Sequence, residues 1–291
     1  MKVASTGGGR VSRWLMRPAP LGRIAALRTV AYLFVPVDVL LTTPWVVQHA
    51  QVPGSLYQPL LIGRLLHLPT PGGWVELLRW VLVGACLVAA TGRLPRALGA
   101  LIAVLYLEWM LVAFSYGKVD HDRVRFLVLL AVLPTVGTAR RGDQARSEAA
   151  GWAVGMTTLA VVATYFLSAI AKLRFGGLDW VDGATLTRAV VRRGTALSTP
   201  LLDHTWVLHA FQYVLLGVEL LVSPLLLVRW REHRITWCLV GGFFLFHLMT
   251  FLTISIVFLP HCVALLALLP LERFGVRRLV QHAPAREPVP A

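Results

Sequence analysis

The chain has 291 residues, of which 57% are hydrophobic and only 14% are charged. Soluble globular proteins carry about 25% charged residues, so a water-facing fold of this length could not bury so much apolar surface. The formal net charge of +14 alone would suit a nucleic-acid-binding protein. The arginines, however, stand in short clusters between apolar runs, which is the arrangement that orients membrane proteins. We therefore expect an all-α, polytopic integral membrane bundle surrounded by the lipid bilayer, and no nucleic-acid partner.

The chain begins with a basic stretch, residues 1–23, which we expect to be a tail without stable structure. The first apolar run follows at 24–44. Because this run carries Arg28 and Asp38 and lacks a small-residue cleavage site, we do not interpret it as a signal peptide. We expect it to be the first transmembrane helix.

Seven further apolar runs approach the length of about 20 residues that a transmembrane helix needs. They cover residues 73–91, 96–115, 124–138, 152–172, 205–228, 235–254 and 256–271. The fourth and eighth runs of the chain are short, and the last two are expected to form a hairpin near Pro260. The sequence thus predicts about eight transmembrane helices in one domain, residues 24–272, followed by a polar tail, residues 273–291.

The distribution of lysine and arginine gives an orientation. With eight spans both termini lie on one side, and that side carries 17 lysines and arginines against nine on the other. The positive-inside rule then predicts a multi-pass protein of the plasma membrane with both termini in the cytoplasm. The basic loop 173–204 is the exception, since it falls on the outer side, and its charge would suit an anionic partner.

Cysteine gives no sign of a metal centre or a disulfide framework. Each of Cys86, Cys238 and Cys262 lies inside an apolar run, and no two are spaced as a zinc-binding pair. We interpret them as small buried hydrophobic residues and predict no metal site.

Ionisable side chains within the apolar runs are the candidate functional residues, because each costs roughly 2.5–3.5 kcal/mol in a membrane. Counting the rise along each helix brings five of the polar residues toward the outer face, where they would line one polar cavity: Asp38, Glu108, His121, Lys172 and His247. Three others fall nearer the inner half and are expected to form structural ion pairs: Arg28, Arg79 and Glu219. Simpler interpretations stay open: Asp38 and Glu108 pair with Arg28 or Arg79, Lys172 extends to the headgroups, and His247 only packs.

Lys172 stands out because the chain has three lysines and 25 arginines. An amine near hydrocarbon loses solvation, which favours its neutral, proton-accepting form, whereas arginine stays charged. Tyr165, Ser168 and Lys172 follow an i, i+3, i+7 spacing and share one helix face. This face is therefore expected to carry polar groups into the cavity.

The order of five motifs resembles the membrane part of vitamin K-dependent gamma-carboxylase and the related horizontally transferred transmembrane domain (HTTM) family. The motifs are "LRTVAYLFVPVD" with Arg28 and Asp38, "YGKVDHDR" with His121, "YFLSAIAKL" with Lys172, "DWVDG" at 179–183 with Trp180, and "FHLMTFLTIS" with His247. The resemblance covers roughly residues 24–272.

The resemblance implies a lyase or oxidoreductase in which Lys172 is the base that deprotonates a reduced quinone of the menaquinone or vitamin K type. His121 and His247 would then hold or protonate the ring oxygens, and the substrate-binding or orienting residues would be Asp38, Glu108, Tyr165, Ser168 and Trp180.

Two departures weaken the analogy with peptide carboxylation. The stretch from Lys172 to Asp179 is longer than in the carboxylase, and the sequence has no counterpart of its large extramembrane domain. There are two alternatives to an enzyme: a non-enzymatic membrane partner of a redox or secretion system, and a small transporter.

Overall fold

The computed structural model of the chain describes residues 9–117, 119, 121–228 and 233–274. Within these residues the regular elements are helices and one short antiparallel ribbon, in which β1 (Ala19–Pro20) pairs with β2 (Arg146–Ser147). The α-helices are α1 (Arg10–Leu15), α2 (Leu21–Val37), α3 (Leu61–Leu65), α4 (Trp74–Ala90), α5 (Ala97–Phe114), α6 (Val124–Val132), α7 (Glu148–Gly176), α8 (Asp179–Asp182), α9 (Thr185–Arg193), α10 (Thr205–Gly217), α11 (His233–Ile254) and α12 (Leu259–Leu265). The predicted all-α class is confirmed over this part of the chain.

Short segments of tighter or wider helix extend and link these helices. The π-helical segments are Asp38–Thr42 and Val218–Val222. The 3₁₀ turns are Pro44–Gln51, Gly54–Leu56, His121–Arg123, Leu133–Thr135, Thr199–His204, Ser223–Leu227, Leu266–Leu268 and Leu271–Phe274.

All eight predicted apolar runs are helical, but not all of them reach the length of a membrane span. Among the described residues, five continuous helices are long and apolar enough: Leu21–Thr42, Ala97–Phe114, Glu148–Gly176, Thr199–Leu227 and Arg234–Ile254. Helix α4 has 17 residues, and α6 and α12 are shorter still. Pro134 follows α6, where the missing amide donor turns the chain into 3₁₀ geometry. Of the eight expected spans, five are therefore supported by a helix of sufficient length. The hydropathy of a run does not show where a 3₁₀ turn ends the helix.

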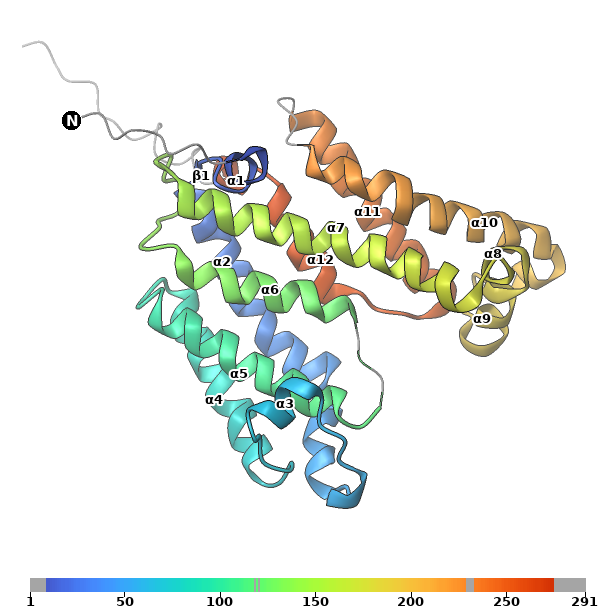
Figure 1. Ribbon diagram of the computed structural model, residues 1–291, viewed down its shortest axis with the longest axis horizontal. Helices are drawn as coiled ribbons and strands as arrows, with labels where there is room; N and C mark the ends of the chain where they lie inside the picture. The colour runs from blue at the N-terminus through green and yellow to red at the C-terminus, as the bar shows by residue number, and fades with distance from the viewer. Residues whose placement is uncertain (1–8, 118, 120, 229–232, 275–291) are drawn as a thin grey trace, which may run out of the picture.

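The first half of the chain packs around one apolar core. Figure 1 shows α2, α4, α5 and α6 grouped together, with the first part of α7 running alongside α6. Tyr32, Tyr106, Trp109 and Phe126 are the largest aromatic side chains buried there without exposure. Aromatic rings contribute large buried areas, so this core holds the five helices together.

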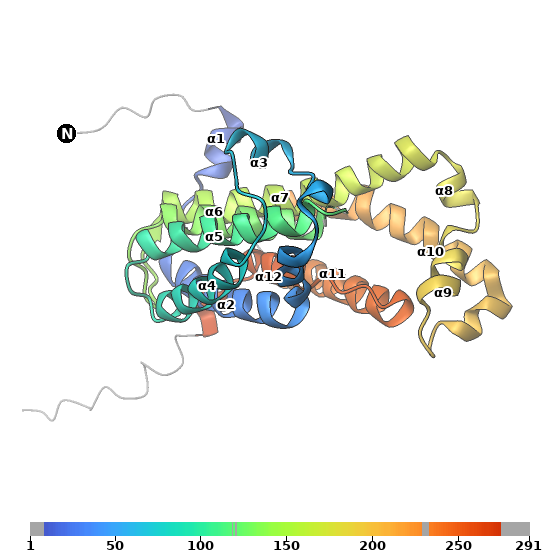
Figure 2. The same cartoon turned by 90° about the horizontal axis from the view of Figure 1, so that it is seen from below.

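Helix α7 continues beyond this core and joins it to the second half of the chain. Its later residues Val161, Tyr165 and Ala169 are buried, and the first two pack with Phe243 of α11 and Leu265 of α12 in a second core. In Figures 1 and 2, α10 and α11 extend away from the first core, and α8 and α9 lie at their far end. The long α7 thus carries Lys172 to the part of the bundle formed by α8 to α11.

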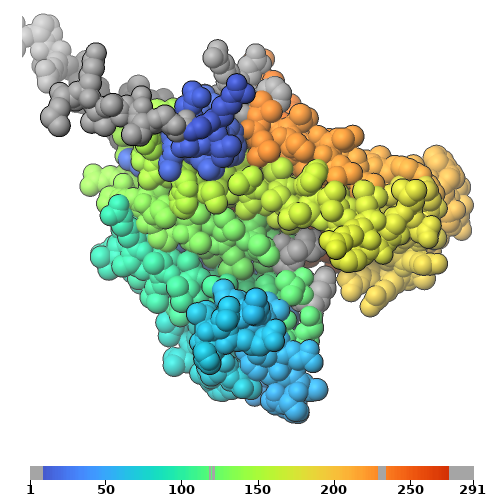
Figure 3. Space-filling model, viewed as in Figure 1, coloured from blue at the N-terminus to red at the C-terminus, as the bar shows by residue number. Residues whose placement is uncertain are grey.

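Residues 10–23, which the composition suggested to be part of a structureless tail, contain regular structure. Residues 10–15 form α1, and the indole nitrogen of Trp14 donates a hydrogen bond to the carbonyl of Leu227 at 2.9 Å. Figure 3 shows α1 in blue, seated between α7 and the orange C-terminal helices. A tertiary hydrogen bond and packing fix this short helix, and neither is visible in a local composition.

Candidate functional site

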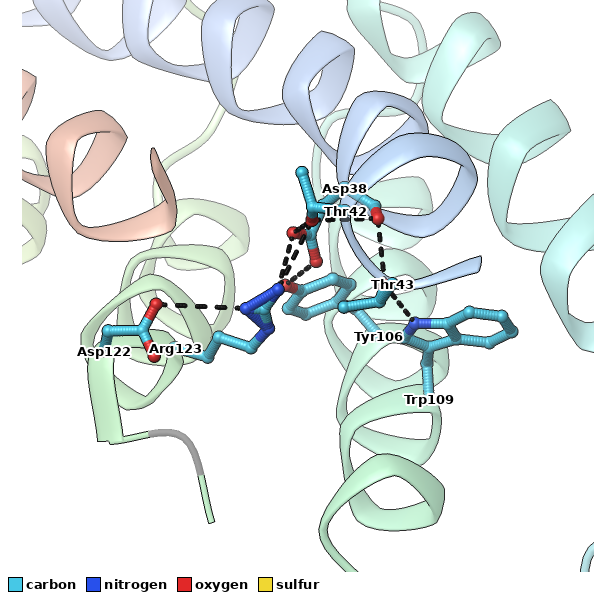
Figure 4. Close-up of polar contacts among 7 residues, drawn as sticks. All are labelled: Asp38, Thr42, Thr43, Tyr106, Trp109, Asp122 and Arg123. Atoms are coloured by element: carbon cyan, nitrogen blue, oxygen red, sulfur yellow. Dashed lines mark hydrogen bonds and ion pairs between the residues drawn. The ribbon is translucent and has the colours of Figure 1, made fainter. Parts of the chain in front are cut away.

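Asp38 is the centre of the first polar cluster. Its side chain is fully buried at the first residue of the π segment that continues α2. The hydroxyl of Tyr106 donates to Asp38 Oδ2 at 2.7 Å, and Arg123 Nη2 donates to Oδ1 at 3.1 Å. Thr42 also donates to this carboxylate, as Figure 4 shows. Both oxygens are satisfied, which is the condition under which a protein tolerates a buried charge.

The cluster reaches α5 and the turn before α6. Trp109 donates from its indole nitrogen to Thr43 Oγ1 at 3.0 Å, and Thr43 donates to the backbone carbonyl of Asp38 at 2.9 Å. On the other side, Arg123 Nη1 lies 3.9 Å from Asp122 Oδ2. Arg123 is therefore held between two carboxylates (Figure 4).

Arg28 and Arg79 have partners other than those expected from the sequence. Arg28 donates to the carbonyls of Leu133 and Gly137, each at 2.8 Å, and to that of Val136. Carbonyls at the end of a helix lack partners within the helix, so Arg28 caps the end of α6 instead of pairing with an acid. Arg79 pairs with Glu76, one turn earlier on α4. In the described structure neither arginine pairs with Asp38 or Glu108, the simpler interpretation that the sequence left open.

Lys172 lies at the centre of the second polar cluster, opposite Glu219. Its Nζ lies 2.5 Å from both carboxylate oxygens of Glu219, and Ser168 donates to Oε1 at 3.5 Å. The ring of Trp180 lies 5.0 Å from the same nitrogen. The Lys172 side chain is 24% exposed and that of Glu219 is 8% exposed. The lysine is therefore paired in a mostly buried site, and the partner of Glu219 is Lys172.

A cavity opens beside this ion pair. It has a volume of about 240 Å³ and is lined by Ser168, Lys172, Glu219 and Trp180 together with apolar side chains such as Phe246 and Phe258. A second, almost wholly apolar cavity of about 240 Å³ lies between α10 and α11 and shares Leu215, Phe246 and Ile254 with the first. The two cavities are neighbours with common wall residues, and the polar groups Lys172, Glu219 and Ser168 line only the first.

Gln212 fixes the wall of the cavity that contains Trp180. Its amide nitrogen donates to the carbonyl of Val181 at 2.6 Å and to that of Gly183 at 3.0 Å, while its amide oxygen accepts from the amide of Leu186 at 2.6 Å. Trp180 also packs on Gly176, where an added Cβ would lie 2.9 Å from the Trp180 Cβ. The segment with the DWVDG motif is thus packed against α10 and α7. No motif in the sequence indicated this role of Gln212.

Tyr165 and His247 form a third, adjacent group. The hydroxyl of Tyr165 and Nε2 of His247 are 2.7 Å apart, and the ring of His261 lies 4.6 Å from each of these two rings. The guanidinium of Arg125 lies 5.6 Å from the Tyr165 ring. His261 was not selected from the sequence, although it is fully buried and neither of its ring nitrogens has a hydrogen-bond partner in the described structure. The sequence did offer a signal for this residue, because His261 lies in the first turn of α12, directly after the break between the last two apolar runs.

The polar residues expected to share one cavity therefore divide among neighbouring groups. Arg123 contacts the Asp38 cluster and Arg125 contacts Tyr165, so both groups lie against the start of α6. Glu108 is half-buried on α5 and takes no part in the hydrogen bonds of the Asp38 cluster. The side chain of His121, like Lys118 and Asp120 of the same motif, lies outside the part of the chain that the structure describes.

One comparison with known families bears on these groups. The HTTM domain family matches residues 132–272. Over these residues the chain is similar to the HTTM family. This HTTM segment runs from the end of α6 to Glu272 and contains Lys172, Trp180, Glu219 and His247. Neither the curated proteins nor the solved structures include a match to the chain. The wider extent of the domain, over residues 24–272, stays a prediction.

Proposed function

We propose that this HTTM protein is a membrane enzyme in which Lys172 takes a proton from a hydroxyl of a lipid-soluble, quinol-type substrate. The observation that carries the proposal is the position of Lys172: its side chain lines a cavity that adjoins an almost wholly apolar cavity between α10 and α11. A ring with a long apolar chain fits such a space, with the ring at Lys172 and the chain between the helices.

The donor set suits a substrate of this kind. A bound quinol would supply an acidic ring hydroxyl. Lys172 and Ser168 present nitrogen and oxygen atoms to it, and Trp180 offers a flat apolar surface for the ring. Glu219 would first accept a proton from Lys172, because a buried ion pair is costly to desolvate and its neutral form is therefore accessible. Lys172 would then act as the base, and the apolar walls would exclude water.

The proposal extends to the surroundings of the site. Tyr165, His247 and His121 would hold the oxygens of the ring, and Asp38 and Glu108 would act on the site through the turn before α6. We further propose that the protein lies in the plasma membrane with both termini in the cytoplasm, on the basis of its arginine distribution.

The first prediction concerns bound quinone. The full chain is purified in mild detergent and its lipid extract analysed by mass spectrometry, for the wild type, for Lys172→Ala and for Arg174→Ala. We expect quinone with the wild type and with Arg174→Ala, an exposed cation near the end of the same helix, and a loss of roughly tenfold or more with Lys172→Ala, since a charge-assisted contact contributes about 1.5–3 kcal/mol. Absence of quinone from the wild type would count against the proposal.

Lys172→Arg separates chemistry from structure. Arginine keeps the pairing with Glu219 but does not give up its proton. We expect this variant to retain stability and bound quinone and to lose oxygen uptake with reduced menaquinone, relative to the protein-free rate. Full oxygen uptake by Lys172→Arg would exclude Lys172 as the base.

A second candidate function rests on the same ion pair. Because Lys172 is fully paired with Glu219, it is also suited to holding α7 against α10 in a protein that keeps the fold and carries out no reaction. A non-enzymatic membrane partner of a redox or secretion system of this kind would lose stability in Lys172→Ala, and would show neither bound quinone nor oxygen uptake in any variant.

A further inference from the structure

Helix α11 presents one row of residues to the two cavities beside Lys172. The row has an i, i+4 spacing and therefore occupies one face of the helix. Its members are Gly242, Phe246, Thr250 and Ile254. The last three line both the Lys172 cavity and the apolar cavity, whereas Gly242 lines only the apolar one. At a rise of about 1.5 Å per residue the row is ~18 Å long, and Gly242 is its end away from the Lys172 cavity.

The wall of the apolar cavity is suited to hydrocarbon. No ionisable side chain is among the described residues that line its 240 Å³. Its two threonines donate hydrogen bonds within α11, Thr250 to the carbonyl of Phe246 at 2.9 Å and Thr253 to that of Met249 at 2.6 Å. The hydroxyl protons are therefore not available to a ligand, and a polar group placed here would lose its hydrogen bonds to water without replacement. A hydrocarbon chain has no such cost.

The surroundings of the apolar cavity agree with an occupant that comes from the bilayer. Phe211 and Val214 of α10 and Leu245 of α11 line it and are exposed. A chain in this cavity would contact the protein on one side and lipid on the other, so a molecule dissolved in the membrane could place its chain there without leaving an apolar environment.

Gly242 leaves room for such a chain. A Cβ added at this position meets no atom of the described structure within 4 Å, so a larger side chain would extend into the cavity that Gly242 lines. Gly241 likewise has no neighbour within 4 Å of an added Cβ, but it lines neither cavity. The two adjacent glycines therefore provide a matched pair for a test.

We propose that the apolar cavity holds the hydrocarbon tail of the ligand whose head lies at Lys172, and that Gly242 leaves the space for a tail that extends beyond Phe246. This rests on the proposed function for the nature of the head, whereas the tail site is defined by the apolar wall. It names the substrate class more closely: a quinol with a long tail is preferred over the same ring without one.

The test compares Gly242→Leu with Gly241→Leu in the purified full chain, in detergent micelles without oxygen. Leucine has a higher helix propensity than glycine, so both variants are expected to fold, which their Tm values check. Native mass spectrometry measures the binding of three probes. They are reduced menaquinone, dimethylnaphthoquinol as a similar ring without the tail, and a polyprenol as a tail without the ring.

We expect the wild type to bind reduced menaquinone more tightly than the tail-free ring. A leucine at position 242 would occupy the space of the tail, so Gly242→Leu should weaken the binding of reduced menaquinone and of the polyprenol by about tenfold, as for other overfilled sites. The same variant should leave the tail-free ring unchanged. Gly241→Leu should keep the affinity for all three probes within about twofold of the wild type.

Lys172→Ala separates the tail site from the proposed reaction. This variant should weaken the binding of both rings and leave that of the polyprenol unchanged. Binding of the polyprenol that depends on Gly242 would support the tail site even if neither ring bound, a result that would count against the proposed function alone.

The tail site is overturned if neither reduced menaquinone nor the polyprenol binds the wild type better than Gly242→Leu. It is also overturned if Gly241→Leu loses as much affinity, because the effect would then belong to the surface of α11 in general. Equal weakening of the tail-free ring by Gly242→Leu would overturn it too, since the substitution would then act on the Lys172 cavity. A wild-type dimer that Gly242→Leu converts into a monomer, with ligand binding unchanged, would make this face an interface between copies of the chain and contradict the proposal.

Discussion

At the scale of single residues, each of two buried acids is held by a cation from another part of the chain. Asp38 receives Arg123, 85 positions away, and Glu219 receives Lys172, 47 positions away. The carboxylates could be selected from the sequence as ionisable groups in apolar runs. The pairings could not, because Arg123 lies between two predicted runs and a helix-depth estimate placed Lys172 and Glu219 in opposite halves of the membrane. Depth along a helix does not determine which neighbour faces a given residue.

The Asp38 cluster permits a prediction about stability. Arg123→Gln removes the only cation that the described structure shows on the Asp38 carboxylate and is expected to cost about 3–5 kcal/mol, as for other broken buried pairs. Tyr106→Phe removes one hydrogen bond to the same carboxylate and is expected to cost about 1–3 kcal/mol. The free energy of unfolding is measured by chemical denaturation in detergent.

Tyr116→Phe is the matched control, because the buried Tyr116 hydroxyl has no hydrogen-bond partner among the described residues. Its removal is expected to be neutral or slightly stabilising. Equal effects of Tyr106→Phe and Tyr116→Phe would mean that the hydrogen bond to Asp38 contributes nothing to stability.

At the scale of elements, both acids lie at the start of a π-helical segment. Asp38 is the first residue of Asp38–Thr42, and Glu219 is the second residue of Val218–Val222. A π segment shifts the register of the helix and frees backbone groups, and such segments are frequent at functional sites. The hydrophobic periodicity predicted the helices themselves but not these segments, since one widened turn does not change which residues are apolar. The same limit hid the 3₁₀ turns that shorten α6 and α12.

The contact of the N-terminal segment with α7 gives a prediction for an element. Gly151→Ala would place a Cβ 2.1 Å from the carbonyl oxygen of Arg17, which is backbone and cannot move without lifting β1 from α7. We expect faster hydrogen exchange at residues 17–22 and a loss of about 1–3 kcal/mol, as for other overpacked positions. Gly84→Ala, in α4 with no atom within 4 Å of the added Cβ, is expected to stabilise by up to about 1 kcal/mol through helix propensity. Unchanged exchange at 17–22 in Gly151→Ala would show that this contact does not hold the segment.

At the scale of the whole molecule, the two halves differ in how much apolar surface they bury. About half of each of the spans Leu21–Thr42, Ala97–Phe114 and Glu148–Gly176 is buried, against 22% of Thr199–Leu227 and 17% of Arg234–Ile254. The exposed apolar surface of α10 and α11 is suited to acyl chains, and the apolar cavity near Lys172 lies between these same two helices. Composition alone predicted a bilayer environment, but it did not show that the candidate site lies in the half whose spans are less buried within the protein.

The two ends of the described chain are joined by one ion pair, and this gives a prediction about pH. Burial acts to raise the pKa of the Glu272 carboxyl, but the hydrogen bonds and charge of Arg23 outweigh it and lower the pKa below its ordinary value of 4.5. A carboxyl with a lowered pKa in the folded state contributes stability above its unfolded pKa and loses it as pH falls through the folded pKa. The wild-type Tm should therefore fall as pH is lowered below 4.5, and Glu272→Gln should have a lower Tm at pH 7 and a shallower decline in acid.

Glu76→Gln, which breaks the partly exposed pair with Arg79 within α4, is the control and should follow the wild-type curve, because such pairs contribute little. Identical acid profiles for Glu272→Gln and wild type would show that the pair with Arg23 does not stabilise the contact between the two ends of the described chain.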